Sequence, residues 1–156
     1  MTWQAQPKGI CSWDFQIRGT DGFVGKTSFG SFGESGEARA GELRFLVEKE
    51  GFFSPEWLLV AGRKIVAEAT KESAFRRTFQ LRFHDGLTVK LRAQGAFGRK
   101  MMASGDGLRL LISPRHPFTR RAVISGHCHR PEALVFCFWL TALVWRRAAS
   151  RAASQS

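Results

Sequence analysis

The sequence predicts a mainly β protein, a closed antiparallel β-barrel wrapped around a hydrophobic C-terminal α-helix. Three observations lead to this fold class. Apolar and polar residues alternate from residue 43 to residue 125, which is the period of half-buried strands. Turn residues interrupt the alternation about every eight to twelve positions, the spacing of barrels and sandwiches. The strand region is followed by a segment that would be apolar on every side as a helix, and such a helix must be surrounded by protein or by lipid.

The strands are read from short runs of period two. Residues 79–83 and 87–92 alternate apolar with polar side chains, and residues 43–48 do so except at Leu46, so one face of each strand is expected to be buried. Asp85-Gly86 separates the last two runs and is a strong signal for a two-residue hairpin turn. This pattern predicts antiparallel neighbours joined by tight turns.

The runs divide the chain into four expected parts. About eight strands are expected between residues 43 and 125, with one or two weaker ones within 13–17 and 28–37. The expected parts are an irregular Gly- and aromatic-rich N-terminal segment (1–27), the barrel strands (28–130), a central apolar helix (131–149) and a flexible tail (150–156).

The apolar segment Ala133–Trp145 is interrupted only by Thr141. Pro131 suits the first helical position, and Glu132 complements the positive end of the helix dipole. The segment would span roughly 20 Å as a helix, short of the ~30 Å hydrocarbon core, which favours a buried helix. A membrane segment over residues 131–147, anchored by its tryptophans and trailing arginines, stays open as the alternative.

A closed barrel has no sheet edges, and a helix can fill a lumen too wide for strand side chains. The order of a WLLVAGRKIVAEATKESAFRRTFQLRF strand run (57–83), basic hairpins and RPEALVFCFWLTALVWRR (130–147) resembles the tubby-like superfamily. The similarity is to its short LURP-one-related and phospholipid-scramblase-like bacterial members, and it covers roughly residues 28–148. It implies a sheet of about a dozen strands around a hydrophobic C-terminal helix. It also implies an affinity for anionic lipid, since some members bind phosphoinositides.

The charge lies almost entirely in the second half of the chain. The sequence holds 24 Lys or Arg against 13 Asp or Glu, a net charge of +11, and residues 73–156 hold 15 of the basic residues with only three acids. This balance excludes an acidic or neutral surface and makes polyanions the first partners to consider. The expected polyanion-binding residues are Arg76, Arg77, Arg82, Arg92, Arg99, Lys100, Arg120 and Arg121.

The composition of this basic half favours lipid over nucleic acid. Arginine outnumbers lysine by 17 to 7 in the chain, and its guanidinium group binds phosphate oxygens in a fork. The phenylalanines fall on the expected inward faces of the strands and do not form a base-stacking platform among the arginines. Anionic membrane surface is therefore the first expected partner.

No motif for catalysis or metal binding emerges. Gly25-Lys26-Thr27 ends like a phosphate-binding loop, but Thr20 stands where that loop needs glycine and no helix start follows, so an edge strand or glycine-rich loop is expected. His127-Cys128-His129 lacks the second ligand pair of a zinc site, so a polar turn is expected there. We therefore expect no enzyme activity, no cofactor and no metal.

Together these observations predict a non-catalytic binding or scaffold protein whose basic face contacts anionic lipid. Two alternatives stay open: a tail-anchored or peripheral membrane protein spanning through residues 131–147, and a nucleic-acid-binding module. The first thirty residues contain no apolar stretch of signal-peptide type and the three cysteines are widely spaced, so a cytoplasmic location with possible membrane attachment is expected. The sequence leaves any protein partner and the oligomeric state open.

Overall fold

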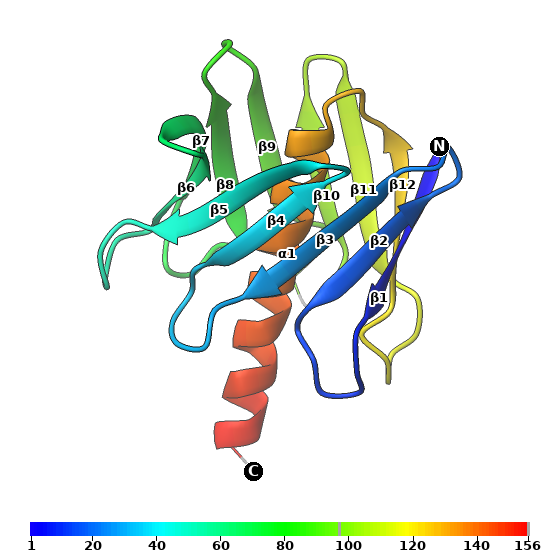
Figure 1. Cartoon of the computed structure of the whole chain (residues 1–156). Coiled ribbons are helices and arrows are strands. Elements are labelled where there is room, and N and C mark those ends of the chain that lie inside the picture. The colour runs from blue at the N-terminus through cyan, green and yellow to red at the C-terminus, as the bar shows by residue number, and fades with distance from the viewer. Residues whose placement is uncertain (97, 156) are drawn as a thin grey trace.

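The computed structural model describes residues 1–96 and 98–155. It confirms the fold class, a closed antiparallel barrel of twelve strands with a C-terminal helix inside it (Figure 1). The elements are β1 (Thr2–Pro7), β2 (Phe15–Gly19), β3 (Val24–Phe29), β4 (Gly36–Ala40), β5 (Leu43–Lys49), β6 (Glu56–Ala61), β7 (Lys64–Lys71), β8 (Thr78–Phe83), β9 (Thr88–Ala93), β10 (Met101–Gly105), β11 (Leu108–Pro114), β12 (Ala122–His127) and α1 (Pro131–Ser154).

The barrel is an up-and-down meander. Each strand pairs antiparallel with the next one along the chain, and β1 pairs with β12 to close the sheet. The hairpin predicted at Asp85-Gly86 joins β8 to β9, and Gly86 has a φ of 97°, which glycine adopts without strain. Strands β5 to β12 are the eight expected in the second part of the sequence. Closure leaves no strand edge unpaired.

The N-terminal part differs from expectation. Residues 1–27 were expected to be irregular, but they hold β1, β2 and the beginning of β3. In β1 only Trp3 and Ala5 face the interior, so the local alternation is too short to indicate a strand. Pairing with β12 on one side and β2 on the other supplies the backbone hydrogen bonds that hold this segment extended.

The barrel interior is filled by the first part of α1. Every residue from Ala133 to Trp145 is buried and belongs to the same core as the inward side chains of the strands. The helix comes closest to β3 and β4, where the inward residues are small: Gly25, Thr27, Ala38 and Ala40. Small residues on one wall and large aromatic ones elsewhere let the helix sit inside a close-packed core.

The tryptophan and threonine side chains of the buried helix have hydrogen-bond partners. Trp139 donates its indole N–H to the Ser28 carbonyl at 2.9 Å, and Trp145 donates to the Arg99 carbonyl at 2.8 Å. The Thr141 hydroxyl donates to the Cys137 carbonyl one turn earlier. The tryptophans proposed as membrane anchors therefore lie in the protein core and tie α1 to the barrel wall.

These contacts bear on the membrane-span alternative. By length and composition α1 could cross a membrane, but 72% of its most apolar stretch is buried inside the protein, as in the core helix of a soluble protein. A span through residues 131–147 would require the helix to leave the barrel. The helix also continues beyond the expected end at residue 149 to Ser154, because the alanine-rich tail favours helix once the buried turns have started it.

Candidate functional site

The two ends of the barrel have different connections. At one end, here called the loop end, six longer segments join the strands: 8–14, 30–35, 50–55, 72–77, 94–100 and 115–121. At the other, the turn end, the connections are mostly tight and contain glycines with φ between 61° and 97°: Gly22, Gly41, Gly62, Gly86 and Gly107. Helix α1 enters at the turn end and leaves at the loop end (Figure 1). Sites on loops held by a rigid scaffold are where binding groups are commonly found.

Six of the eight sequence-predicted basic residues lie at the loop end. Arg76 and Arg77 are on the β7–β8 loop, residues 99 and 100 on the β9–β10 loop, and residues 120 and 121 on the β11–β12 loop. These three loops are neighbours around the barrel rim, because β7 to β12 are consecutive in the sheet. The fold therefore gathers three basic pairs that lie far apart in the sequence.

The other two predicted residues lie on the outer wall. Arg82 is on β8 and stands opposite Glu68 of β7, while Arg92 is on β9. The hollow beside Arg82, about 490 Å³, is lined also by Glu56, Glu68 and Glu72. This part of the wall has mixed charge, so Arg82 does not belong to the basic group at the loop end. Arg92 stands opposite Thr78, next to the end of β9 from which the β9–β10 loop begins.

Three arginines hold the loops to one another. Arg77 donates to the carbonyls of Gly95, Ala96 and Gly98 on the next loop, at 2.6–3.1 Å. Because these acceptors are backbone carbonyls, the arginine charge is retained at the surface while the loop is fixed.

Two further arginines, Arg99 and Arg120, also connect neighbouring loops of the rim through backbone carbonyls. Arg99 donates to the carbonyls of His116 and Pro117 on the β11–β12 loop. Arg120 donates to the Ser12 carbonyl on the β1–β2 loop, and its guanidinium lies 3.8 Å from the ring centre of Trp13. Each bridging arginine thus links its own loop to the following one.

The basic charge of the loops has no carboxylate partner. The six loops hold eight Lys or Arg and four Asp or Glu, whereas the connections at the turn end, including 128–130, hold two basic and four acidic residues. Within residues 1–96 and 98–155, none of the eight loop cations forms an ion pair. Lys8, Arg76, Lys100 and Arg121 are exposed and their side chains contact no described hydrogen-bond acceptor. These four are the loop cations most available to a ligand.

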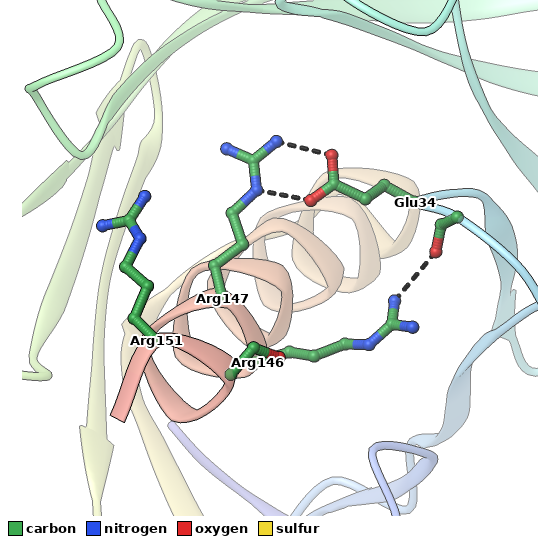
Figure 2. Close-up of a pocket in the computed structure, with 6 residues that line it drawn as sticks. Glu34, Arg146, Arg147 and Arg151 are labelled. Carbon is green, nitrogen blue, oxygen red and sulfur yellow. Dashed lines mark hydrogen bonds and ion pairs between the residues drawn. The ribbon is translucent and has the colours of Figure 1, made fainter. Parts of the chain in front are cut away.

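The exit of α1 adds further positive charge. Figure 2 shows Glu34 of the β3–β4 loop facing Arg147, while Arg146 donates to the Gly33 carbonyl at 3.0 Å. Lys49 of β5 also reaches Glu34, with its Nζ 2.9 Å from the carboxylate. The loop and the helix are therefore joined twice, by the Glu34 carboxylate and by the Gly33 carbonyl.

The ionisation of Glu34 follows from these contacts. Burial by itself raises the pKa of Glu34, but the hydrogen bonds from Arg147 and Lys49 outweigh it and lower the pKa to about 2. Nearby, burial and then the charges of Arg147 and Arg151 lower the pKa of Lys71. A positive potential therefore persists here even though Glu34 is fully ionised at neutral pH.

The geometry of the two other candidate motifs, Gly25-Lys26-Thr27 and His127-Cys128-His129, does not match a phosphate-binding loop or a metal site. Gly25, Lys26 and Thr27 lie within strand β3, where their backbone N–H groups cannot wrap a phosphate. His127 ends β12, and the Cys128 thiol donates to the Arg130 carbonyl. Among the described residues, no three His, Cys, Asp or Glu side chains gather as metal ligands. The loop end can bind anions through its guanidinium and ammonium groups.

Sequence reasoning identified most of the basic residues but not their common location. It did not include Arg146, Arg147 or Arg151, which the helix brings to the same end. A signal was present: in a meander every second connection lies at the same end, and the three basic pairs fall on every second connection. No protein-family model, curated protein or solved structure matches this chain.

Proposed function

We propose that this protein is a non-catalytic binding protein that attaches to anionic membrane surfaces through the loop end of its barrel. The observation that carries the proposal is the basic rim, in which eight loop cations have no carboxylate partner among the described residues. Juxtamembrane cations contribute about 1 kcal/mol each near an anionic leaflet, so several on one rim suffice for attachment at low salt. We infer a cytoplasmic location with recruitment to the membrane.

Two features support lipid over nucleic acid. The loop cations lie on four neighbouring loops at one end of a barrel, whereas a single strand of nucleic acid is typically bound along an extended basic groove. Three of them, Arg77, Arg99 and Arg120, are arginines held by backbone carbonyls, so their guanidinium groups are fixed in position before a phosphate binds. The resemblance to tubby-like barrels is part of the same proposal and agrees with a helix-filled barrel of twelve strands.

Vesicle sedimentation tests this function. The protein is expected to sediment with vesicles containing phosphatidylserine at about 0.1 M NaCl and not with vesicles of phosphatidylcholine alone. The charge-reversal variant R76E/K100E/R121E should lose at least about tenfold in affinity, because six units of charge change on the rim.

A matched control uses the opposite end. R18E/R63E/R109E makes the same change in net charge at exposed positions near the turn end and should bind within about twofold of the parent. Equal losses in both variants would mean that only net charge matters and would refute a site at the loop end. Tighter binding to duplex or single-stranded nucleic acid than to anionic vesicles at equal salt would favour the nucleic-acid alternative.

A further inference from the structure

The loop end also carries the most exposed apolar side chains of the described chain. Six large apolar residues are between 83% and 98% exposed, and all six lie on loops at this end: Ile10, Phe32, Phe52, Phe53, Phe75 and Phe118. Five of the six loops contribute at least one of them. The sixth loop contains Phe97, which lies outside the described residues.

The remainder of the surface is different. The next most exposed large apolar residue is Met1 at 57%, and the others reach 54% or less. The loop-tip side chains do not stabilise the fold by packing: Phe52 and Phe53 contact each other edge to face, Phe118 lies beside His116, and all are open to solvent. Exposed apolar groups gathered on one face indicate an interaction surface.

The phenylalanines of these loops were expected to face inward, but they are exposed. The charge near them argues for one kind of partner. A second copy of the chain would bring one basic rim against another, and the like charges would repel. A bilayer with anionic lipid offers phosphates for the arginines and, directly beneath them, apolar volume for the phenylalanines. The loops 8–14, 72–77 and 115–121 each carry both cationic and exposed apolar side chains, which match this layering.

Resting on the proposed function, we propose that the loop tips form an insertion rim, with Ile10 and the loop phenylalanines entering the apolar side of the membrane interface while the rim cations bind lipid phosphates. The barrel then stands with its loop end on the bilayer and its turn end in the solvent. The partner is a fluid anionic bilayer and not a soluble polyanion.

The exposed end of α1 fits this orientation. Gly33 of the β3–β4 loop lines the same hollow as Ser150 and Arg151. Residues 148–155 are exposed, so about two turns of the helix, roughly 12 Å, project past its buried part. These turns would lie against the lipid headgroups, where Arg151 can bind phosphate.

A probe at a natural cysteine tests insertion directly. Cys11 is exposed on the β1–β2 loop beside Ile10, whereas Cys128 is half-buried and Cys137 buried. Burial raises the pKa of both latter thiols, so an environment-sensitive NBD maleimide reacts first at Cys11. Its emission should shift to shorter wavelength on addition of phosphatidylserine vesicles, while the label in C11S/D106C at the turn end should show no shift.

A serine variant tests the energetic role of the tips. F32S/F75S/F118S should bind anionic vesicles at least about tenfold more weakly than the parent at about 0.1 M NaCl, and the loss should persist at about 0.5 M, because salt screens the rim charges and not the apolar contribution. The control V24S/L43S/I65S removes exposed apolar side chains near the turn end and should bind like the parent at both salt concentrations.

The outcomes separate the two proposals. Binding at low salt with no emission shift and no effect of F32S/F75S/F118S would overturn the insertion rim and leave the electrostatic function standing. Absence of binding to anionic vesicles at low salt would overturn both. If sedimentation velocity shows a dimer that F32S/F75S/F118S converts to a monomer, the rim belongs to a second copy and insertion is refuted.

Discussion

The two ends of this barrel are built from different kinds of connection. At the turn end, tight turns that contain glycine join the strands. There Arg130 forms ion pairs with Glu132 in the first turn of α1 and with Asp85 in the β8–β9 turn. At the loop end, longer segments bring exposed phenylalanines and basic residues to the surface, and arginines bound to backbone carbonyls hold these loops in place. The connections at the turn end stabilise the fold, whereas the loop end exposes apolar and basic side chains that contribute little to stability.

This contrast teaches how stability and binding are separated in one small domain. Substitutions at the turn end should change the free energy of unfolding with little effect on membrane binding. Substitutions of unpartnered groups at the loop end should do the reverse, since fully exposed side chains contribute little to stability. Substitution of a bridging arginine or of Glu34 should change both the free energy of unfolding and the affinity for membranes.

The largest effect on stability is expected from Gly126→Ala near the turn end. Gly126 has a φ of 131°, and an added Cβ would lie 2.1 Å from the Arg109 carbonyl oxygen, so the β11–β12 pair must move apart. We expect a loss of about 3 kcal/mol in the free energy of unfolding by urea titration, with unchanged vesicle affinity of the folded fraction.

Gly107→Ala is the matched control for that prediction. Gly107 has a φ of 70° but open space around it, so only backbone strain is added, at about 1 kcal/mol. Equal losses in the two variants would contradict the close approach of β11 and β12. Weakened vesicle binding in either one would break the separation between the two ends.

Glu34→Gln should lower stability and strengthen binding at the same time. The variant leaves Arg147 and Lys49 half-buried without their carboxylate, and we expect a loss of about 2 kcal/mol at pH 7. It also makes the loop end more positive. Glu50→Gln, an exposed acid on the neighbouring loop with no described side-chain partner, should leave stability unchanged within about 0.5 kcal/mol.

The same pair of variants predicts a pH dependence. Because the pKa of Glu34 falls from 4.5 to about 2 on folding, its contribution is complete above pH 4.5 and is lost as the pH falls toward 2. Urea titrations across this window should show a fall for the parent that is smaller for Glu34→Gln. A parent and variant with parallel pH profiles would refute the role of this ion pair.

The smallest expected difference in stability is that between Arg77→Ala and Arg76→Ala. Arg77→Ala removes the hydrogen bonds to the β9–β10 loop and should cost about 1 kcal/mol of stability, with faster amide exchange in residues 94–100. Arg76→Ala should cost less than about 0.5 kcal/mol. Both remove one rim charge and should weaken vesicle binding by about fivefold. Equal stability losses would contradict the bridging role.

The candidate site was predictable in its residue types more than in its arrangement. Arg76, Arg99 and Arg121 stand out in the sequence as members of basic pairs. Arg82 looks equivalent to them, because alternation places it on an outward face, but only the sheet register sets it opposite Glu68. The alternation of apolar and polar residues predicts which face of a strand a side chain lies on, but it does not predict which residue of the neighbouring strand stands opposite.

The N-terminal strands show the same limit. A run with two inward apolar residues, Trp3 and Ala5, carries too little periodic signal. Its extended form depends on hydrogen bonds to β12, more than a hundred residues away along the chain. The tryptophans of α1 were ambiguous for a related reason, since an indole can be anchored by a lipid interface or by a buried carbonyl.

By itself the sequence determined the strands from β5 onward, their tight turns, the all-apolar helix and the excess of positive charge, because each depends on periodicity or composition over a few neighbouring residues. The tertiary structure alone decided that β1 closes the barrel, that protein surrounds the helix, and that Ile10, Phe32, Phe75 and Phe118 meet at one rim. These outcomes depend on pairing between distant segments, and a meander returns every second loop to the same end.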